Sequence, residues 1–170
     1  MIGTDRLVLR SWREDDRPFF RALNADPDVM HDYPTLPDPA AVDTKFDRYR
    51  AHFNDHGFGR WVLELRQDGD ILGYVGPMPF WPENPLGPGM EMGWRLKRSA
   101  WGHGYASEAA RAALADGFAR LGFKEVWAVT GEANLRSQAV MNRTGMVRVA
   151  AKDYRSADPS QSWLVWVARP

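Results

Sequence analysis

Ser99-Ala100-Trp101-Gly102-His103-Gly104-Tyr105-Ala106 is a glycine-rich turn that joins a predicted strand, residues 90–96, to a predicted helix, residues 105–121. The first backbone N–H groups of a helix have no partners within it, and the helix dipole adds partial positive charge at that end. Two glycines one residue apart let a phosphate approach the backbone, because no Cβ stands in the way. The turn is therefore predicted to bind a pyrophosphate.

The turn alone does not identify the ligand, because NAD, ATP and coenzyme A all carry linked phosphates. The third glycine of a dinucleotide fingerprint would fall at Ser107, and no acidic residue is clearly placed to bind a ribose. No Gly-Lys-Ser/Thr follows the glycines, so the turn is not a Walker loop either. A nucleotide-binding protein is therefore one hypothesis, to be weighed against the rest of the chain.

The composition limits the kinds of partner. The 170 residues include 22 basic and 22 acidic side chains, and 44% of the residues are hydrophobic. We expect a single domain over residues 1–170, with no nucleic acid and no membrane as partner. The chain has no cysteine, which excludes disulfides and thiolate metal sites and is compatible with a cytoplasmic protein. His52 and His56 have no clear third ligand, so we expect no metal.

Hydrophobic periodicity predicts a mixed α/β (α+β) fold with a mostly antiparallel sheet. About seven strands are expected, at residues 6–10, 61–66, 71–75, 90–96, 125–130, 146–151 and 163–168. About four helices are expected, one after Asp15 and three more at residues 40–56, 105–121 and 134–144. Asn134 is the predicted N-cap of the last helix. Five prolines between Gly76 and Pro88 predict an irregular excursion from the sheet.

Three blocks of sequence, in order, carry a resemblance to a known family. The first is Thr4-Asp5-Arg6-Leu7-Val8-Leu9-Arg10, leading through Glu14-Asp15-Asp16 to Asp26-Pro27-Asp28-Val29-Met30. The second runs from Glu91-Met92-Gly93-Trp94 to Trp101–Ala109, and the third from Asn134-Leu135-Arg136-Ser137 to Val140–Met146. Together they resemble the GNAT superfamily of acetyl-CoA-dependent N-acetyltransferases, and within it the Rim-type ribosomal-protein N-acetyltransferases. The resemblance implies the GNAT fold, in which the strands at 90–96 and 125–130 splay apart.

The resemblance also implies a site for acetyl-CoA (coenzyme A) as cosubstrate, without a metal. The coenzyme A pyrophosphate would lie on the backbone of the turn, at Trp101, Gly102, His103, Gly104, Tyr105 and Ala106. The pantetheine arm would bind the free strand edge at Trp94, Arg95 and Leu96, and its thiol end would face Asn134 and Ser137.

Acetyl transfer to an amine needs a base, because an α-amine has a pKa of about 7.7–8.0 and reacts only when neutral. Glu91 is the predicted catalytic base, since the resemblance turns it toward the cleft; the alternatives are a solvated carboxylate or a partner of Arg95. Ser137 is predicted as the catalytic partner or acid of the thiol, and the alternative is a helix-face hydroxyl that bonds the backbone. Many members of the family carry a tyrosine as general acid where Met141 stands here.

The residues predicted to bind the acceptor are Tyr33, Phe80, Trp81 and Glu91. The first three lie in proline-rich loops, where large apolar side chains need a reason, and core packing is the alternative. The predicted function is direct transfer of an acetyl group from acetyl-CoA to a primary amine, either a peptide N-terminal α-amine or a small-molecule amine. The alternative is a coenzyme A or acyl-CoA sensor module without efficient turnover, which Met141 favours. A homodimer is compatible with the resemblance.

Overall fold

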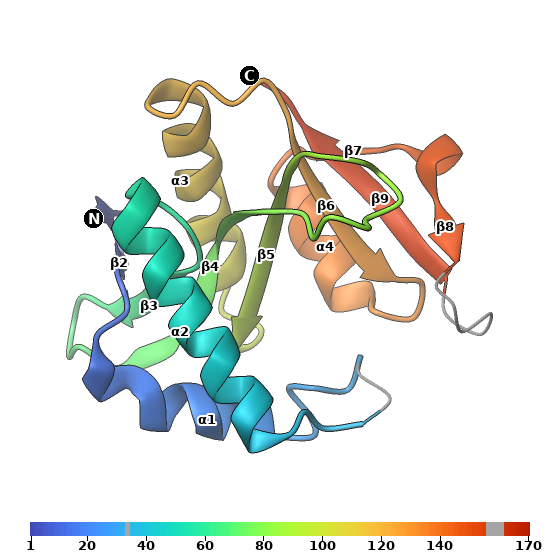
Figure 1. Cartoon of the computed structure of the whole chain (residues 1–170). Helices are drawn as coiled ribbons and strands as arrows, with labels where there is room; N and C mark the ends of the chain where they lie inside the picture. The colour runs from blue at the N-terminus through green and yellow to red at the C-terminus, as the bar shows by residue number, and fades with distance from the viewer. Residues whose placement is uncertain (33–34, 156–161) are drawn as a thin grey trace.

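The computed structural model describes residues 1–32, 35–155 and 162–170, and within them four α-helices pack around one nine-stranded sheet (Figure 1). The helices are α1 (Arg17–Ala25), α2 (Pro39–His56), α3 (Tyr105–Ala119) and α4 (Leu135–Arg143). The strands are β1 (Ile2–Gly3), β2 (Leu7–Arg10), β3 (Trp61–Leu65), β4 (Ile71–Pro79), β5 (Met90–Leu96), β6 (Val126–Gly131), β7 (Val147–Arg148), β8 (Tyr154–Arg155) and β9 (Ser162–Ala168).

The sheet is antiparallel except between two central strands. Its order is β1-β2-β3-β4-β5-β6-β9-β7, and β8 pairs with β9. β5 and β6 run parallel and pair at a single position, Glu91 with Trp127. Beyond that position the two strands separate toward their C-terminal ends, as Figure 1 shows. The predicted mixed fold and its splay are confirmed, and the two-residue strands β1 and β8 are added to the predicted seven.

Two hydrophobic layers cover opposite faces of the sheet. α1 and α2 lie in front of it in Figure 1, where Trp12, Phe20, Phe46 and Tyr74 form a cluster of edge-on and stacked rings. α3 lies behind the sheet and presents small residues to it, of which Ala109, Ala110 and Ala113 are completely buried. Small side chains let the helix axis come close to the strands. The glycine turn before α3 (residues 101–104) therefore lies directly against the end of β5.

The irregular excursion predicted to begin at Gly76 begins after Pro79 instead. β4 continues through Pro77 and Pro79, which pair with Met92 and Met90 of β5. β3 begins only at Trp61, whose partner is Val75, so the other edge of β4 is unpaired beyond that point. Proline is tolerated in a strand where its missing N–H faces an unpaired edge. The prediction that the strand ends at Val75 is therefore wrong, because the local sequence cannot show where the neighbouring strand β3 begins.

The strand predicted over residues 146–151 is also shorter than expected. β7 spans Val147–Arg148, and a short 3₁₀ turn follows at Ala150–Lys152. The N–H of Val165 on β9 donates to Asp153 Oδ1 over 3.0 Å. A side-chain carboxylate thus takes the place that a strand carbonyl would occupy, and Arg148 pairs with the same carboxylate.

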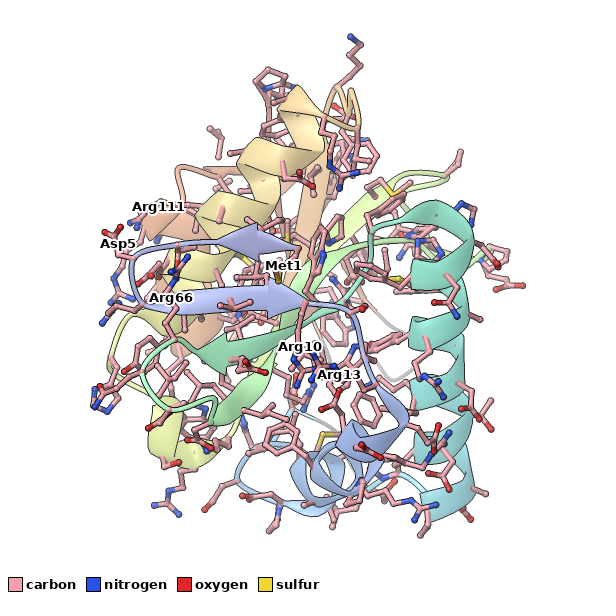
Figure 2. The ribbon with its side chains drawn as sticks, turned by 90° about the vertical axis from the view of Figure 1, so that its left-hand side faces the viewer. Met1, Asp5, Arg10, Arg13, Arg66 and Arg111 are labelled. Carbon is pink, nitrogen blue, oxygen red and sulfur yellow. The ribbon has the colours of Figure 1, made fainter. Side chains whose placement is uncertain are left out.

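A buried ion pair fixes the path from β2 into α1. Arg10 donates to both oxygens of Asp16, over 2.7 and 2.9 Å, and its Nε donates to Glu64 over 2.6 Å. Arg10 and Asp16 are only 8% and 4% exposed. The hydrogen bonds that Arg10 donates to Asp16 raise the pKa of Arg10 against the opposing effect of burial. Figure 2 shows Arg10 and Arg13 side by side where the chain leaves the edge of the sheet.

We expect Asp16→Asn to lower the free energy of unfolding by about 3 kcal/mol, because it leaves the buried Arg10 with Glu64 as its only carboxylate. Urea denaturation followed by tryptophan fluorescence measures the change. Asp47→Asn is the matched control, since it removes a 60% exposed partner of Arg17 and should cost at most about 1 kcal/mol. If the two variants lose the same free energy of unfolding, the buried Arg10–Asp16 pair does not contribute more than the exposed pair, and the prediction is wrong.

Candidate active site

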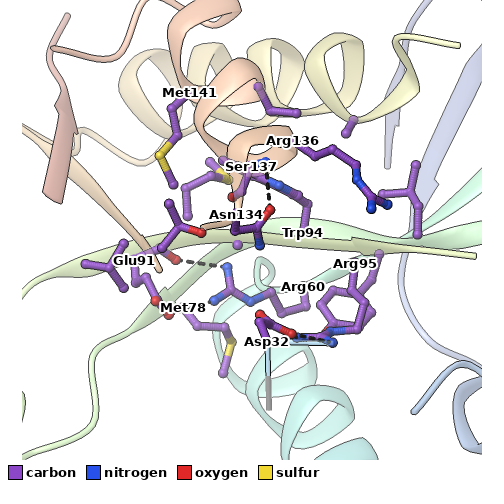
Figure 3. Close-up of a pocket in the computed structure, with 18 of the residues that line it drawn as sticks. Asp32, Arg60, Met78, Glu91, Trp94, Arg95, Asn134, Arg136, Ser137 and Met141 are labelled. Carbon is purple, nitrogen blue, oxygen red and sulfur yellow. Dashed lines mark hydrogen bonds and ion pairs between the residues drawn. The ribbon is translucent and has the colours of Figure 1, made fainter. Parts of the chain in front are cut away.

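A cleft of about 1220 Å³ opens where β5 and β6 separate. Its walls come from the glycine turn, α4, β5, and α2 with the end of β4 (Figure 3). Tyr33 lies outside the described residues. All other residues predicted as site residues line this one cleft: Phe80, Trp81, Glu91, Trp94, Arg95, Leu96, Trp101, Gly102, His103, Gly104, Tyr105, Ala106, Asn134 and Ser137.

The glycine turn lies between β5 and α3, as the sequence predicts, and both of its glycines adopt a left-handed backbone. Gly102 and Gly104 have φ values of 79° and 80°, in the left-handed region that other residues enter only with strain. Gly104 is the N-cap of α3, so the unpaired N–H groups of the helix start face the cleft end of the turn. A Cβ built on Gly102 would meet no atom within 4 Å, so the space before the backbone is open.

One local and two long-range contacts hold the turn in place. The Trp101 indole N–H donates to Leu96 O over 2.9 Å, which ties the turn to the end of β5. Arg6 donates to His103 O over 3.1 Å and pairs with Glu108 over 2.6 Å. Burial of Glu108 raises its pKa, but hydrogen bonds from Thr4 and Arg6 outweigh this and lower the pKa. Thr4 and Arg6, just before β2, thus hold the first turn of α3, about a hundred residues further along the chain.

α4 supplies one side of the cleft, which we call the α4 side (Asn134, Arg136, Ser137 and Met141). Asn134 Oδ1 accepts from the Ser137 N–H over 3.1 Å, so the predicted N-cap is confirmed. The Arg136 guanidinium lies 4.2 Å from the centre of the Trp101 ring, beside the glycine turn. Met141 is 1% exposed, and its thioether cannot donate a proton.

Glu91 stands at the last position where β5 and β6 pair, and an arginine orients it. Arg60 Nη2 donates to Glu91 Oε2 over 2.9 Å, and Nη1 donates to Glu91 O over 3.0 Å and to Gly76 O. Arg60 is 6% exposed, whereas the Glu91 side chain is 21% exposed. A Cβ on Gly93 would lie 2.6 Å from the guanidinium carbon, so glycine there makes room for Arg60.

The ion pair proposed from the sequence between Glu91 and Arg95 does not form. Arg95 donates to Val29 O over 2.8 Å and lies 3.4 Å from Asp32. Figure 3 shows Asp32, Arg95 and Arg60 on the side of β5 opposite α4. Arg60 was not predicted as a site residue, because nothing near it in the sequence indicates that its guanidinium reaches β5.

We call this second wall the α2 side of the cleft (Asp32, Lys45, Arg48, Tyr49, His52, Arg60, Tyr74 and Arg95). Lys45 Nζ lies 3.4 Å from Asn24 Oδ1 and 3.5 Å from the Tyr74 hydroxyl. Tyr74 is 4% exposed. Burial raises the pKa of its phenol, but Lys45, Arg95 and Arg60 outweigh burial and lower the pKa to about 8. The spacing of Lys45 and Tyr49, four residues apart on a helix, is the only sequence signal for this group.

The two described aromatic residues predicted to bind an acceptor differ in burial. Phe80 is 9% exposed and packs with Trp127, Val165 and Val167, as the core-packing alternative expects, while Trp81 is 46% exposed. Tyr154 also lines the cleft and was not predicted. Burial, together with the nearby Glu91 carboxylate, raises the pKa of Tyr154 to about 12. Its phenol is therefore protonated at neutral pH.

Within the described ranges, no three His, Cys, Asp or Glu side chains are grouped so that they could hold a metal ion. His52 and His56 lie with their rings 4.4 Å apart, and burial followed by the charge of His56 lowers the pKa of His52. None of the helices described is long and apolar enough to cross a bilayer.

Comparisons with known proteins agree with this architecture. Residues 6–147 match the family model described as an acetyltransferase (GNAT) domain. The chain is 35% identical over 146 residues to the uncharacterised protein YkkB of Bacillus subtilis, covering 85% of this chain and 84% of that protein. It is 31% identical over 156 residues to the FsC-acetyl coenzyme A-N(2)-transacetylase of Aspergillus fumigatus, covering 87% of this chain and 65% of the fungal protein. The crystal structure of an acetyltransferase from Agrobacterium tumefaciens matches with a TM-score of 0.84 at 27% identity, covering 99% of this chain and 94% of that one.

The charges around Tyr74 predict that one tyrosine ionises near pH 8, well below the usual value of about 10. Ultraviolet absorbance of tyrosinate during a pH titration measures this step, and Tyr74→Phe should remove it. The lowered folded-state pKa means that ionisation stabilises the fold relative to Tyr74→Phe. This added stability is fully present above about pH 10 and is lost as the pH falls through about 8.

Tyr49→Phe is the matched control, because Tyr49 is equally buried beside Tyr74 and burial raises its pKa instead. The early step should survive this change. If no tyrosine of the wild-type protein ionises below about pH 9, the surrounding cations do not lower the pKa of Tyr74 and the prediction is wrong.

Proposed function

The chain belongs to the GNAT acetyltransferase family, and from this membership and the geometry of the cleft we propose that it transfers an acetyl group from acetyl-CoA directly to a primary amine. The acceptor is a peptide N-terminal α-amine or a small-molecule amine. The observation that carries the proposal is the single pairing of β5 with β6 at Glu91, which places a carboxylate at the closed end of the splay. The similarity to the fungal FsC-acetyl coenzyme A-N(2)-transacetylase supports it.

The residues present fit coenzyme A. Beyond Glu91 the edge of β5 is not paired with β6, so its backbone groups are available to the amides of a pantetheine arm. The open, left-handed turn at Gly102 and Gly104 presents helix N–H groups to a pyrophosphate, and Arg136 adds positive charge beside it. Acetyl-CoA supplies an activated thioester. The remaining tasks belong to the side chains and backbone of this chain.

Glu91 is the proposed base, accepting the proton that the amine must lose. Arg60 is the proposed positioning residue, because its bonds to the side chain and the carbonyl of Glu91 hold the carboxylate in one orientation. A backbone N–H on the unpaired edge of β5 would stabilise the negative charge that develops on the thioester oxygen. Ser137, at the first turn of α4, is the proposed proton donor to the departing thiolate, whose pKa is about 8.5.

Met141 favours a second candidate function. A buried thioether occupies the position where the family resemblance places a tyrosine, so the coenzyme could be bound without efficient turnover. The chain would then act as a coenzyme A or acyl-CoA sensor. Tight binding of acetyl-CoA with no transfer to any amine would favour this function over catalysis.

Gly102→Asp should weaken acetyl-CoA binding at least about 100-fold in calorimetry, because it sets a carboxylate against the phosphates at the helix start. Gly122→Asp is the matched control. Gly122 has a similar φ of 71° and equally open surroundings, so the two substitutions should cause a similar backbone strain. Gly122 does not line the cleft. Affinity that survives Gly102→Asp would overturn the assignment of the turn.

Glu91→Gln should lower kcat by about 10²–10⁴-fold while leaving the affinity for acetyl-CoA unchanged. The loss should shrink as the pH rises above the pKa of the amine, because a neutral amine needs no base. Glu125→Gln, a 41% exposed partner of Arg169, should have no effect on the rate. A deficit that is the same at every pH would assign Glu91 a structural role through Arg60 instead.

A further inference from the structure

The α2 side of the cleft carries more positive than negative charge. Four permanent cations line it: Lys45 and Arg48 from α2, Arg60 from the residue before β3, and Arg95 from β5. The carboxylates in the described lining of the whole cleft are Asp32, on this side, and Glu91, which Arg60 reaches on β5, so the four cations of the α2 side meet two anions, a net charge of +2. Each carboxylate is already in an ion pair, Glu91 with Arg60 and Asp32 with Arg95.

One face of α2 presents the excess charge to the cleft. Lys45, Arg48, Tyr49 and His52 follow the spacing i, i+3, i+4, i+7 and all line the cavity. The Arg48 guanidinium lies 5.6 Å from the Tyr49 ring centre, and no carboxylate pairs with it among the described residues. The remaining basic residues of α2 behave differently. Arg50, for example, pairs with Glu14 and does not line the cleft.

The cations stabilise negative charge at this place in the fold. The Tyr74 phenol, although buried, is more acidic than a free tyrosine because Lys45, Arg95 and Arg60 surround it. Lys45, Arg60 and Arg95 are at least partly buried and so lose part of their hydration, whereas Arg48 is exposed at the mouth of the same wall. An incoming anion restores to the buried cations favourable interactions that water no longer provides. An acceptor that carried only positive charge would instead meet repulsion along the same wall.

We propose that the α2 side of the cleft binds an anionic group of the acceptor, so that the substrate is an amine that also bears a carboxylate or a phosphate. Lys45 and Arg48 are the residues that bind this anion, while Glu91 faces the amine of the same molecule. The inference rests on the proposed acetyl transfer and narrows its acceptor. It favours small amino-acid-like compounds over polyamines and over uncharged amines.

The test compares acceptors that differ only in the anion. Two pairs serve: a dipeptide against its C-terminal amide, and phosphoethanolamine against ethanolamine, with spermidine as a cationic amine. We expect kcat/KM to be about 10–100-fold higher for the anionic member of at least one pair, and lowest for spermidine. The pair that shows the preference distinguishes carboxylate from phosphate.

Substitutions then locate the preference. Lys45→Gln and Arg48→Gln should each lower kcat/KM for the anionic acceptor about tenfold or more, lower it much less for the uncharged partner, and leave the affinity for acetyl-CoA unchanged. Arg50→Gln, on the same helix outside the cleft, is the control. If kcat/KM for the amides, ethanolamine or spermidine equals that for the anionic acceptors, the inference is wrong, although the proposed acetyl transfer still holds.

Calorimetry separates failure of this inference from failure of the proposed function. If no amine is acetylated, binding of the dipeptide and of its amide is measured directly in the presence of acetyl-CoA. Tighter binding of the acid, lost in Lys45→Gln, would support the anion site although catalysis failed. Equal binding of acid and amide, or a preference unchanged in both variants, would overturn it.

Discussion

The single pairing between β5 and β6 is the constraint on which the rest of the site depends. Parallel strands that share a full ladder leave no backbone group for a ligand, whereas these two separate after Glu91 and Trp127. The separation leaves the last residues of β5 with one unpaired edge, facing a cleft that α4 and the glycine turn border. Backbone hydrogen-bonding groups inside a fold must find partners. Because β5 and β6 pair at only one position, the backbone groups along the rest of this edge of β5 are available to hydrogen-bond a ligand.

Arg60 links this separation to the packing behind it. Its guanidinium crosses under β5 and bonds the carbonyl oxygens of Gly76 and Glu91, which lie on neighbouring strands. Glycine at position 93 is required for this, because a Cβ there would collide with the guanidinium. The same buried cation orients Glu91, so the position of the proposed base depends on a residue 31 positions earlier in the chain.

The two sides of the cleft differ in chemistry because different layers of the fold build them. The α4 side combines backbone N–H groups, a helix cap and Arg136 next to Trp101, which suits a phosphate-containing ligand. The α2 side belongs to the layer of α1 and α2, where buried tyrosines lie among cations. Figure 3 shows Asn134, Arg136 and Ser137 on one side of β5. Asp32, Arg60 and Arg95 lie on the other side. The proposed transfer between two bound molecules requires such an arrangement, with one molecule on each side of the cleft.

Local sequence was sufficient for several features that depend on backbone chemistry over a few residues. The alternation of 90–96, the glycines at 102 and 104, and the Asn134 cap each predicted an element that the structure contains, and the three blocks predicted a family that the comparisons confirm. Tertiary structure alone decided where β4 ends, because the limit on Pro77 and Pro79 is the start of a neighbouring strand. It also decided that Glu91 pairs with Arg60 rather than Arg95, and that Lys45 and Tyr74 meet beside the cleft. Ion pairs and fields depend on distances between residues that are remote in sequence, and only the packing of the layers sets those distances.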